Sequence, residues 1–212
     1  MNTPPLWKTL PLAFAFASAG ALAQDDMRGA YVGLSVGQSR VTIEDSAVTV
    51  LGATASSFSK DETDTGFKLY AGYRFNRHFA LEGGWTDLGS FRATRNVTAP
   101  AVGSLSAEIE ASGFHFDAVG ILPLQQFFLF GKLGLMYATT ETSRSSTGAV
   151  VLAGPRSSKD SEVEFKAGVG AGFAFTRNLA IRAEFERVTD VGTTETGEGD
   201  IDLISIGVTW RF

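Results

Sequence analysis

The last twelve residues of the chain, 201–212, alternate between large apolar side chains and small or polar ones. Counting by twos places on one face Ile204, Ile206, Val208, Trp210 and Phe212, and on the other Ser205, Gly207, Thr209 and Arg211. Because successive side chains of a β-strand point to opposite faces, this period of two predicts a strand with one apolar and one polar face. Such a strand suits a wall with lipid on one side and water or packed side chains on the other.

The same alternation occurs in seven earlier segments, each near the ~9–11 residues that a tilted strand needs to cross the apolar layer of a membrane. Together, the predicted strands are Ala30–Val41, Thr65–Phe75, Phe79–Leu88, Glu108–Leu122, Phe127–Thr139, Glu162–Phe175, Leu179–Val188 and Ile201–Phe212. After residue 23, no apolar run approaches the ~20 residues of a transmembrane helix. A membrane protein that crosses with strands must close them into a barrel, so that every backbone polar group is paired. The pattern therefore predicts an all-β fold, an eight-stranded antiparallel up-and-down transmembrane β-barrel.

The connections between the predicted strands fall into two length classes. Three are tight turns, at Asn76–His78, Pro123–Gln126 and Thr176–Asn178. Four are long polar segments, at Thr42–Asp64, Gly89–Ala107, Thr140–Ser161 and Thr189–Asp200. This alternation is typical of outer-membrane barrels, which have short turns on the periplasmic side and long loops on the cell surface. An even number of strands also places both ends of the barrel on the periplasmic side.

One face of the predicted strands carries no charge and is expected to face lipid. It includes Leu69, Ala71, Tyr73, Phe75, Phe79, Leu81, Trp85, Phe116, Ala118, Leu122, Leu129, Leu133, Leu135, Val163, Ala167, Val169, Phe173, Leu179, Ile181 and Phe185. Aromatic residues gather near both ends of this face, as in the interfacial girdles of membrane proteins. A soluble β-sandwich with a phenylalanine-rich core is the alternative fold, but it requires neither two girdles nor a terminal aromatic residue.

The N-terminal segment predicts export. Lys8 precedes an apolar run, Leu10–Leu22, which ends in the small-x-small sequence Ala21-Leu-Ala23. These features are typical of a cleavable signal peptide, here residues 1–23, and leave 24–212 as the barrel domain.

Removing Lys8 from the 18 basic residues while keeping the 23 acidic ones gives the mature chain a net charge of −6. This acidity argues against nucleic acid as a partner. The chain has no cysteine, which excludes disulfides and a lipidated N-terminal cysteine.

The closing segment also resembles the last strand of bacterial outer-membrane barrels. In those proteins a C-terminal aromatic residue is part of the signal read by the barrel-assembly machinery, and the resemblance gives this role to Trp210 and Phe212. Over Gln24–Phe212 the chain is similar to small OmpA-like, OmpX-like and opacity-protein-like barrels. The resemblance implies a monomer in the outer membrane of a Gram-negative cell, in contact with membrane lipids and lipopolysaccharide. OmpA itself continues into a peptidoglycan-binding domain, and that function is not carried over.

The inward face of the predicted barrel collects charged residues separated by glycines. Counted from their short turns, five of them lie three to five positions along their strands and are expected at one level: Glu82, Asp117, Lys132, Arg182 and Glu184. An eight-stranded barrel is just wide enough for side chains to fill it, so paired charges would form a structural plug, or alternatively a gate on a narrow path. OmpA-type barrels contain such a cluster, and the resemblance assigns it to Glu82, Lys132, Arg182 and Glu184. The alternation does not say which carboxylate faces which base.

The sequence gives little support for catalysis. His78 lies in a predicted turn, and His115 is expected to face inward with Asp117. Lipid A deacylases of similar fold have a lipid-facing His-x-Ser pair, and here the position of the serine is occupied by Asp117. Two separate histidines and no cysteine cannot form an ordinary zinc site. Gly168-Val-Gly-Ala-Gly172 lies inside a predicted strand with no helix after it, so no nucleotide site and no cofactor are expected.

The sequence therefore predicts a non-enzymatic barrel that contributes to envelope integrity and presents its loops to a host or surface ligand, for example in adhesion. Basic residues in those loops are candidates for contact with lipopolysaccharide phosphates: Arg92, Arg95, Arg144, Arg156 and Lys159. A narrow porin-like channel for ions or small solutes is the second hypothesis. A lipid A-modifying enzyme is the third.

Overall fold

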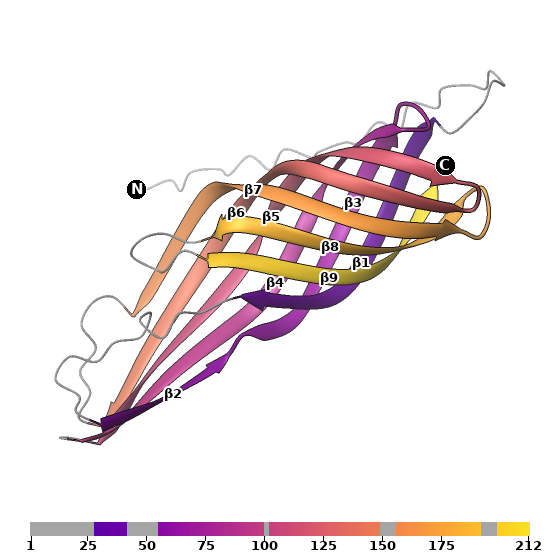
Figure 1. The fold of residues 1–212 in the computed structure, drawn as a ribbon. Helices are drawn as coiled ribbons and strands as arrows, with labels where there is room; N and C mark the ends of the chain where they lie inside the picture. Colours follow the sequence, from indigo (N-terminus) through magenta and orange to yellow (C-terminus); the bar gives the residue numbers. More distant parts are fainter. Residues whose placement is uncertain (1–27, 42–54, 100–101, 149–155, 192–198) are drawn as a thin grey trace, which may run out of the picture.

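The computed structural model describes residues 28–41, 55–99, 102–148, 156–191 and 199–212 (Figure 1). The predicted signal peptide lies outside these residues. The regular elements are nine strands: β1 (Gly29–Val41), β2 (Ala55–Asp61), β3 (Thr63–Arg74), β4 (Phe79–Ala99), β5 (Gly103–Leu124), β6 (Phe127–Gly148), β7 (Ser157–Ala174), β8 (Leu179–Val191) and β9 (Gly199–Arg211). The described part of the chain contains no helix with the length and apolar character needed to span a bilayer.

Eight of the nine strands form a closed antiparallel ring, which confirms the predicted barrel. Around the ring the order is β4-β3-β1-β9-β8-β7-β6-β5, and β5 pairs back with β4. The first and last strands of the ring are neighbours, with Tyr31 opposite Arg211. Figure 1 shows these strands tilted around one axis, with the C-terminus at the end that carries the short turns. No strand of the ring is left with an unpaired edge within the membrane-spanning part, as the absence of water there requires.

The structure corrects the prediction for the segments expected to be long loops. Within 42–64, the segment Ala55–Asp61 forms β2, which pairs with residues 92–99 of β4. Most of 89–107 and much of 140–161 continue the strands β4, β5, β6 and β7, whose far ends run past the rest of the barrel beside β2 (Figure 1). We call this part, formed by β2, residues 91–99, 103–109, 142–148 and 157–160, the surface extension. Its strands lack the apolar alternation because their outer face meets water instead of lipid.

The surface extension is held together by polar pairs between neighbouring strands. Hydroxyls of Thr94 and Ser106 lie 3.1 Å apart, and those of Ser104 and Thr147 lie 2.7 Å apart. Opposed side chains of this kind stabilise antiparallel pairs. Ser and Thr therefore mark strands here, although in the sequence they are typical of loops.

A β-bulge in β4 reverses the faces of the strand where it leaves the membrane. Pairing with β5 shifts between Asp87 and Gly89, and Gly89 has a φ of +84°, which favours glycine. One carboxylate oxygen of Asp64 accepts hydrogen bonds from the backbone N–H of Ser90 (2.6 Å) and from its hydroxyl (3.2 Å). Hydrogen bonds from the backbone N–H groups of Ser90 and Thr65 lower the pKa of Asp64. Because of the extra residue, the chain beyond the bulge turns Phe91 inward and Arg92 outward.

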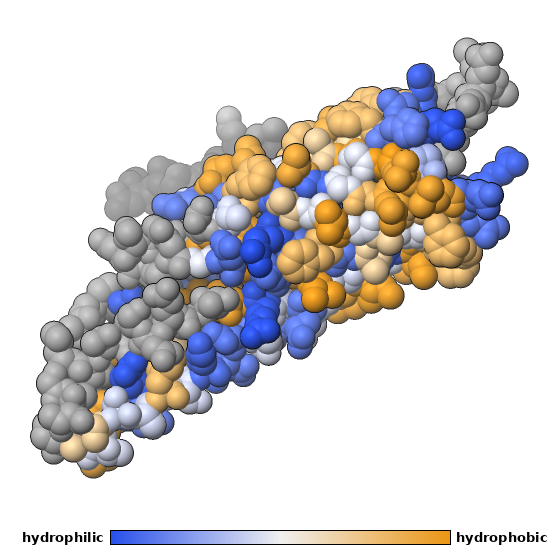
Figure 2. Space-filling model, viewed as in Figure 1, coloured by the Kyte–Doolittle hydropathy of each residue, from blue (hydrophilic) through white to orange (hydrophobic). Residues whose placement is uncertain are grey.

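The outer wall of the ring is apolar, as predicted. Every residue of the predicted lipid-facing set is exposed or partly exposed, with Leu69, Phe116 and Val169 at 55%, 60% and 62%. Figure 2 shows apolar atoms gathered over the part of the molecule with the short turns and polar atoms toward the surface extension. At the short-turn end aromatic rings pack against one another. The ring centroids of Phe127 and Phe173, for example, lie 4.8 Å apart. These contacts form part of the predicted periplasmic girdle.

The lumen is divided into three layers along the barrel. An aromatic layer lies toward the short turns and contains Tyr31, Tyr70, Ala80, Val119, Ile121, Phe128 and Phe130. A charged layer follows. Toward and within the surface extension lies an apolar layer with Leu88, Phe91, Ala93, Ala111, Met136, Ala138, Val188, Val191, Ile201 and Leu203. The apolar layer was not predicted, because the alternation was used to place charges and glycines inside.

Lumen glycines make room for bulky neighbours. A Cβ added to Gly170 would lie 2.3 Å from the ring of Phe130, and one added to Gly172 would lie 2.1 Å from the ring of Phe128. Gly72 makes the same space for the ring of Tyr31. Each large ring therefore depends on a missing side chain on the next strand.

Candidate functional site

The charged layer of the lumen is the candidate site. It consists of Lys68, Glu82, His115, Asp117, Lys132, Lys166, Arg182, Glu184 and Glu186, which come from β3, β4, β5, β6, β7 and β8. All nine point inward and are buried. The five residues predicted to share one level are all in this layer.

Four of the predicted residues form a closed cycle of alternating charge. Arg182 Nη1 lies 2.6 Å from Glu82 Oε1, and Arg182 Nη2 lies 3.3 Å from Glu184 Oε2. Lys132 Nζ lies 2.7 Å from Glu82 Oε2 and 2.7 Å from Glu184 Oε2. Each member of the cycle therefore has two partners of opposite sign. The hydroxyl of Tyr31 also donates a hydrogen bond to Glu82 Oε1 at 2.8 Å.

The cation of Arg182 is further enclosed by aromatic rings. Its Cζ lies 4.8 Å from the ring centroid of Tyr70 and 4.4 Å from that of Phe130. Stacking on aromatic faces suits a guanidinium group, which is more weakly hydrated than an ammonium group. The aromatic layer thus fixes the orientation in which Arg182 meets the two carboxylates.

Asp117 lies opposite Glu82 in the register of β4 and β5, and it joins the layer through a second chain of ion pairs. Lys166 Nζ lies 3.0 Å from Asp117 Oδ2 and 2.9 Å from Glu186 Oε1. Lys68 Nζ lies 2.5 Å from Glu186 Oε2 and 2.9 Å from Glu184 Oε1. Through Glu184 and Glu186 the chain of ion pairs connects to the cycle.

Lys68, Lys166 and Glu186 complete a site that the sequence defined only in part. The alternation predicts that all three face inward, but their place in the network depends on the register between strands. One clue was Gly168, which lies opposite Glu186 and leaves room for its side chain. With these residues the layer has four basic side chains and four carboxylates, so its formal charges balance. Balanced pairing is what makes the burial of so many charges tolerable.

The two histidines have unlike surroundings. His115 Nδ1 lies 2.8 Å from Asp117 Oδ2 inside the barrel, and His115 Nε2 has no hydrogen-bond partner among the described residues. His78 lies in an exposed turn, with Nδ1 3.2 Å from the carbonyl oxygen of Ile121. Within the described ranges no three His, Cys, Asp or Glu side chains are grouped so that they could hold a metal ion.

The layer is almost completely shielded from solvent. Lys68 and Asp117 have no exposed surface, and Glu82 is 1% exposed. On the side of the surface extension the apolar layer covers it, with Met136 also fully buried. The geometry can hold the strands together through the lumen, and it leaves no open path to these groups from the side of the surface extension.

Comparison with known proteins identifies the family. A family described as outer membrane protein beta-barrel domain matches residues 9–212. The chain belongs to this family of outer-membrane β-barrels. This confirms the resemblance drawn from the alternation and the closing strand, and it places the protein in the outer membrane of a Gram-negative cell.

Relatives of this barrel are distant in sequence. An uncharacterised protein of Coxiella burnetii is 27% identical over 184 residues, which cover 75% of this chain and 73% of the relative. Outer membrane protein A of Yersinia pseudotuberculosis is 28% identical over 156 residues, 72% of this chain and 41% of that protein. The barrel thus matches less than half the length of the Yersinia protein.

Two solved structures share the fold. Neisserial surface protein A has a TM-score of 0.50 at 16% identity, and the match covers 87% of this chain and 97% of that one. OprG, an outer membrane protein of Pseudomonas aeruginosa, has a TM-score of 0.50 at 17% identity, with 87% and 96% covered. At this level of identity the likeness concerns the architecture alone.

The two residues of the predicted assembly signal lie on the outside of the barrel. Trp210 and Phe212 face outward at the short-turn end and are 47% and 64% exposed, and the backbone N–H of Phe212 donates to the carbonyl oxygen of Ala30. Their role in assembly stays a prediction. Of the basic residues predicted to meet lipopolysaccharide, Arg92 forms an ion pair with Glu108 at 2.9 Å, and Lys159 forms one with Glu141.

Proposed function

We propose that this outer-membrane barrel is a non-enzymatic scaffold that contributes to envelope integrity and holds its surface extension outside the membrane for adhesion or other contacts. The observation that carries the proposal is that the lumen is filled by side chains while the wall of the barrel extends beyond the membrane. The lumen is occupied by balanced ion pairs and an apolar layer, whereas four strands of the ring continue past the lipid-facing band and are joined there by β2.

The surface extension has the build of a rigid platform. Phe91 and Ala93 are buried within it, and Phe58 and Leu105 pack against the same apolar cluster from two other strands. Its outer face carries polar and charged side chains, including the exposed Arg92 and Lys159. A sheet with an apolar inside and a polar outside presents a fixed pattern of groups to a partner, unlike a set of solvated loops.

The surroundings of His115 favour a non-enzymatic role. Acyl hydrolysis of a lipid needs a nucleophile, a base and access for the lipid. His115 is 4% exposed, faces the lumen and contacts a carboxylate of the ion-pair network. A lipid in the surrounding membrane therefore cannot reach it.

The proposal is tested by removing the surface extension and keeping the barrel. Residues 92–108 are replaced by Asn-Gly between the paired residues Phe91 and Ile109, and residues 143–157 by Asn-Gly between the paired residues Thr142 and Ser158. Two-residue Asn-Gly turns match the twist of antiparallel strands, so the shortened barrel is expected to fold. Its folding is checked by the mobility of unheated and heated samples in detergent gels.

Cells that lack the protein are complemented with the full-length or the shortened chain. We expect the full-length chain alone to restore adherence to polystyrene and to an epithelial cell layer, and both chains to restore resistance to vancomycin and bile salts. Adherence restored equally by the folded, shortened chain would refute the role of the surface extension. Unchanged resistance in cells without the protein would refute the role in envelope integrity.

A further inference from the structure

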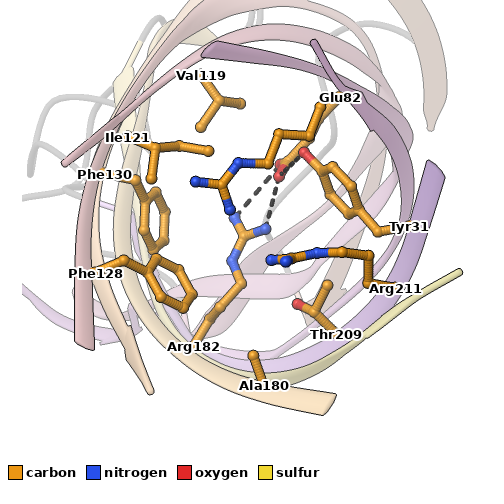
Figure 3. A pocket seen from close by; sticks show the side chains of 11 residues that line it. Tyr31, Glu82, Val119, Ile121, Phe128, Phe130, Ala180, Arg182, Thr209 and Arg211 are labelled. Carbon is orange, nitrogen blue, oxygen red and sulfur yellow. Dashed lines mark hydrogen bonds and ion pairs between the residues drawn. The ribbon is translucent and has the colours of Figure 1, made fainter. Parts of the chain in front are cut away.

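A small cavity lies in the lumen between the charged layer and the short turns. Its volume is about 40 Å³, and it is lined by Tyr31, Arg74, Glu82, Val119, Ile121, Phe128, Phe130, Ala180, Arg182, Thr209 and Arg211 (Figure 3). A single water needs roughly 10–15 Å³ in this measure, so the space is large enough for about three waters or for one small anionic group. We call it the periplasmic cavity.

The periplasmic cavity has more positive charge than the charged layer above it. Arg182 is neutralised by Glu82 and Glu184. Neither Arg74 nor Arg211 has a carboxylate partner among the described residues. Arg74 and Arg211 are moreover close enough to repel each other electrostatically. Like charges at the mouth of a low-dielectric lumen attract an anion and exclude cations.

Hydrogen-bond donors of these arginines remain available to a ligand. Arg74 is held by the turn, since its Nε and Nη2 donate to the carbonyl oxygens of Asn76 (3.1 Å) and Arg77 (2.6 Å). The guanidinium of Arg211 donates no hydrogen bond within the described part of the chain, and Figure 3 shows it pointing across the cavity toward Arg182. The turn thus fixes one cation in place and leaves the other directed at the lumen.

Arg182 supplies an independent sign of a ligand. The side chain is 5% exposed, and both its terminal nitrogens contact carboxylates. Its Nε–H is buried and has no hydrogen-bond partner among the described residues. A buried donor of a charged group without a partner is costly, and Arg182 lines the periplasmic cavity. The unpartnered donor thus belongs to a side chain that lines the cavity.

We propose that the periplasmic cavity binds a small oxyanion, a carboxylate or a phosphate group. The planar, forked donors of arginine match the oxygen atoms of such groups better than they match a spherical ion. The rings of Phe128 and Phe130 line the wall beside the arginines and suit an apolar substituent on the anion. The site thus differs from the charged layer, in which every charge already has a partner.

Two sources can supply this chemistry. One is a free anion of the periplasm. The other is the chain itself, because Asp25 and Asp26 precede β1 in the sequence and lie outside the described residues. The experiment therefore compares the wild type with an Asp25→Asn, Asp26→Asn variant.

The binding is measured by NMR on the protein in lipid nanodiscs with ¹⁵N-labelled arginine. Inorganic phosphate, and separately acetate, is titrated against chloride at constant ionic strength. We expect saturable shifts of the Nε–H signals of Arg182 and Arg211. Arg211→Gln should weaken the apparent affinity roughly tenfold, as expected for the loss of one charge-assisted contact. Arg92→Gln removes an equal charge from the surface extension and should leave the affinity unchanged.

Each outcome decides one part of the proposal. Saturation in the wild type means that a free anion occupies the cavity. Saturation only in the Asp25→Asn, Asp26→Asn variant means that carboxylates of the chain occupy it. No saturable shift in either protein, or equal weakening by Arg211→Gln and Arg92→Gln, overturns the proposal. Detergent-gel mobility verifies that the variants are folded, and thermal unfolding with phosphate or chloride gives a second measure of binding.

Discussion

At the scale of single residues, the period of two decides which way a side chain points, and the register between strands decides what it meets. The alternation alone places Glu82, Lys132 and Arg182 in the lumen, and the structure confirms this. It could not pair them, because Arg182 lies on β8 and meets Glu82 of β4 across the lumen. Such contacts depend on strand tilt and on the stagger of the whole ring, neither of which a local pattern contains.

Asp117 illustrates the same limit. Counting from the short turns placed it at the level of Glu82, which lies opposite it on β4, but could not show that its partners are His115 and Lys166. Counting along a strand gives the level of a side chain and not the groups that it meets. Gly168 lies opposite Glu186 and leaves room for its side chain. The sequence alone does not give the register between the two strands, so it could not show that these residues face each other.

We predict that Glu82 and Arg182 are energetically coupled. Replacing either by Ala leaves a buried charge without its main partner and should lower the free energy of unfolding by about 3–5 kcal/mol. The double variant should lose less than the sum of the two single losses, because the orphaned charge is gone. Denaturant unfolding in lipid vesicles measures the free energy of unfolding of the wild type, the two single variants and the double variant.

The exposed pair Arg92 and Glu108 serves as the control for this cycle. These side chains are 2.9 Å apart on the outside of the surface extension, where solvent screens their interaction. Their Ala variants should combine additively. Additive losses at Glu82 and Arg182 as well would show that the ion pair in the lumen has no coupling energy of its own.

At the scale of elements, strands in the membrane were predictable and strands beyond it were not. Lipid outside and packed side chains inside impose the alternation of β9 and its neighbours. The surface extension has water on its outer face, so Thr94 and Ser106 resemble loop residues although they pair across two strands. The bulge near Gly89 adds a change of face, which the sequence did not indicate because Gly89 was expected to begin a loop.

We predict that the closing strand directs assembly through Phe212. Deleting Phe212 should reduce the amount of folded barrel in the outer membrane several-fold, measured by gel mobility of isolated membranes. Phe127→Ala is the matched control, because Phe127 is a similarly exposed aromatic residue of the same girdle, at 61% against 64%. Normal amounts of folded protein without Phe212, or an equal loss with Phe127→Ala, would remove the special role of the last residue.

At the scale of the whole molecule, the closed ring and its eight membrane strands were predictable, and the filling of the ring was predictable only in part. Short and long connections in alternation pointed to the barrel before any contact was known. The apolar layer was not predicted, because the sequence around Leu88, Met136 and Leu203 shows only that each belongs to an alternating strand. Their common level became visible only when the strands were placed side by side.

We predict that the protein does not conduct ions steadily in a planar lipid bilayer. The double variant Glu82→Ala, Arg182→Ala should also remain nearly silent, because the apolar layer still forms a dry constriction. Shortening Met136 and Leu203 to Ala in addition should produce conductance. Reproducible conductance of the wild type would instead favour the channel hypothesis and make the charged layer its selectivity filter.

The surface extension also determines how far from the cell a contact is made. Strands advance by about 3.3 Å per residue, so the stretch from Gly103 to Ile109 alone spans roughly 20 Å along the strand. Two residues added to both strands of a hairpin would lengthen it by about 6–7 Å and keep every side chain on its face, whereas one residue would reverse them all. The extension can therefore lengthen or shorten only in steps of two residues per strand if its side chains are to stay on the same face. Its length can change while the lipid-facing wall and the charged layer stay the same.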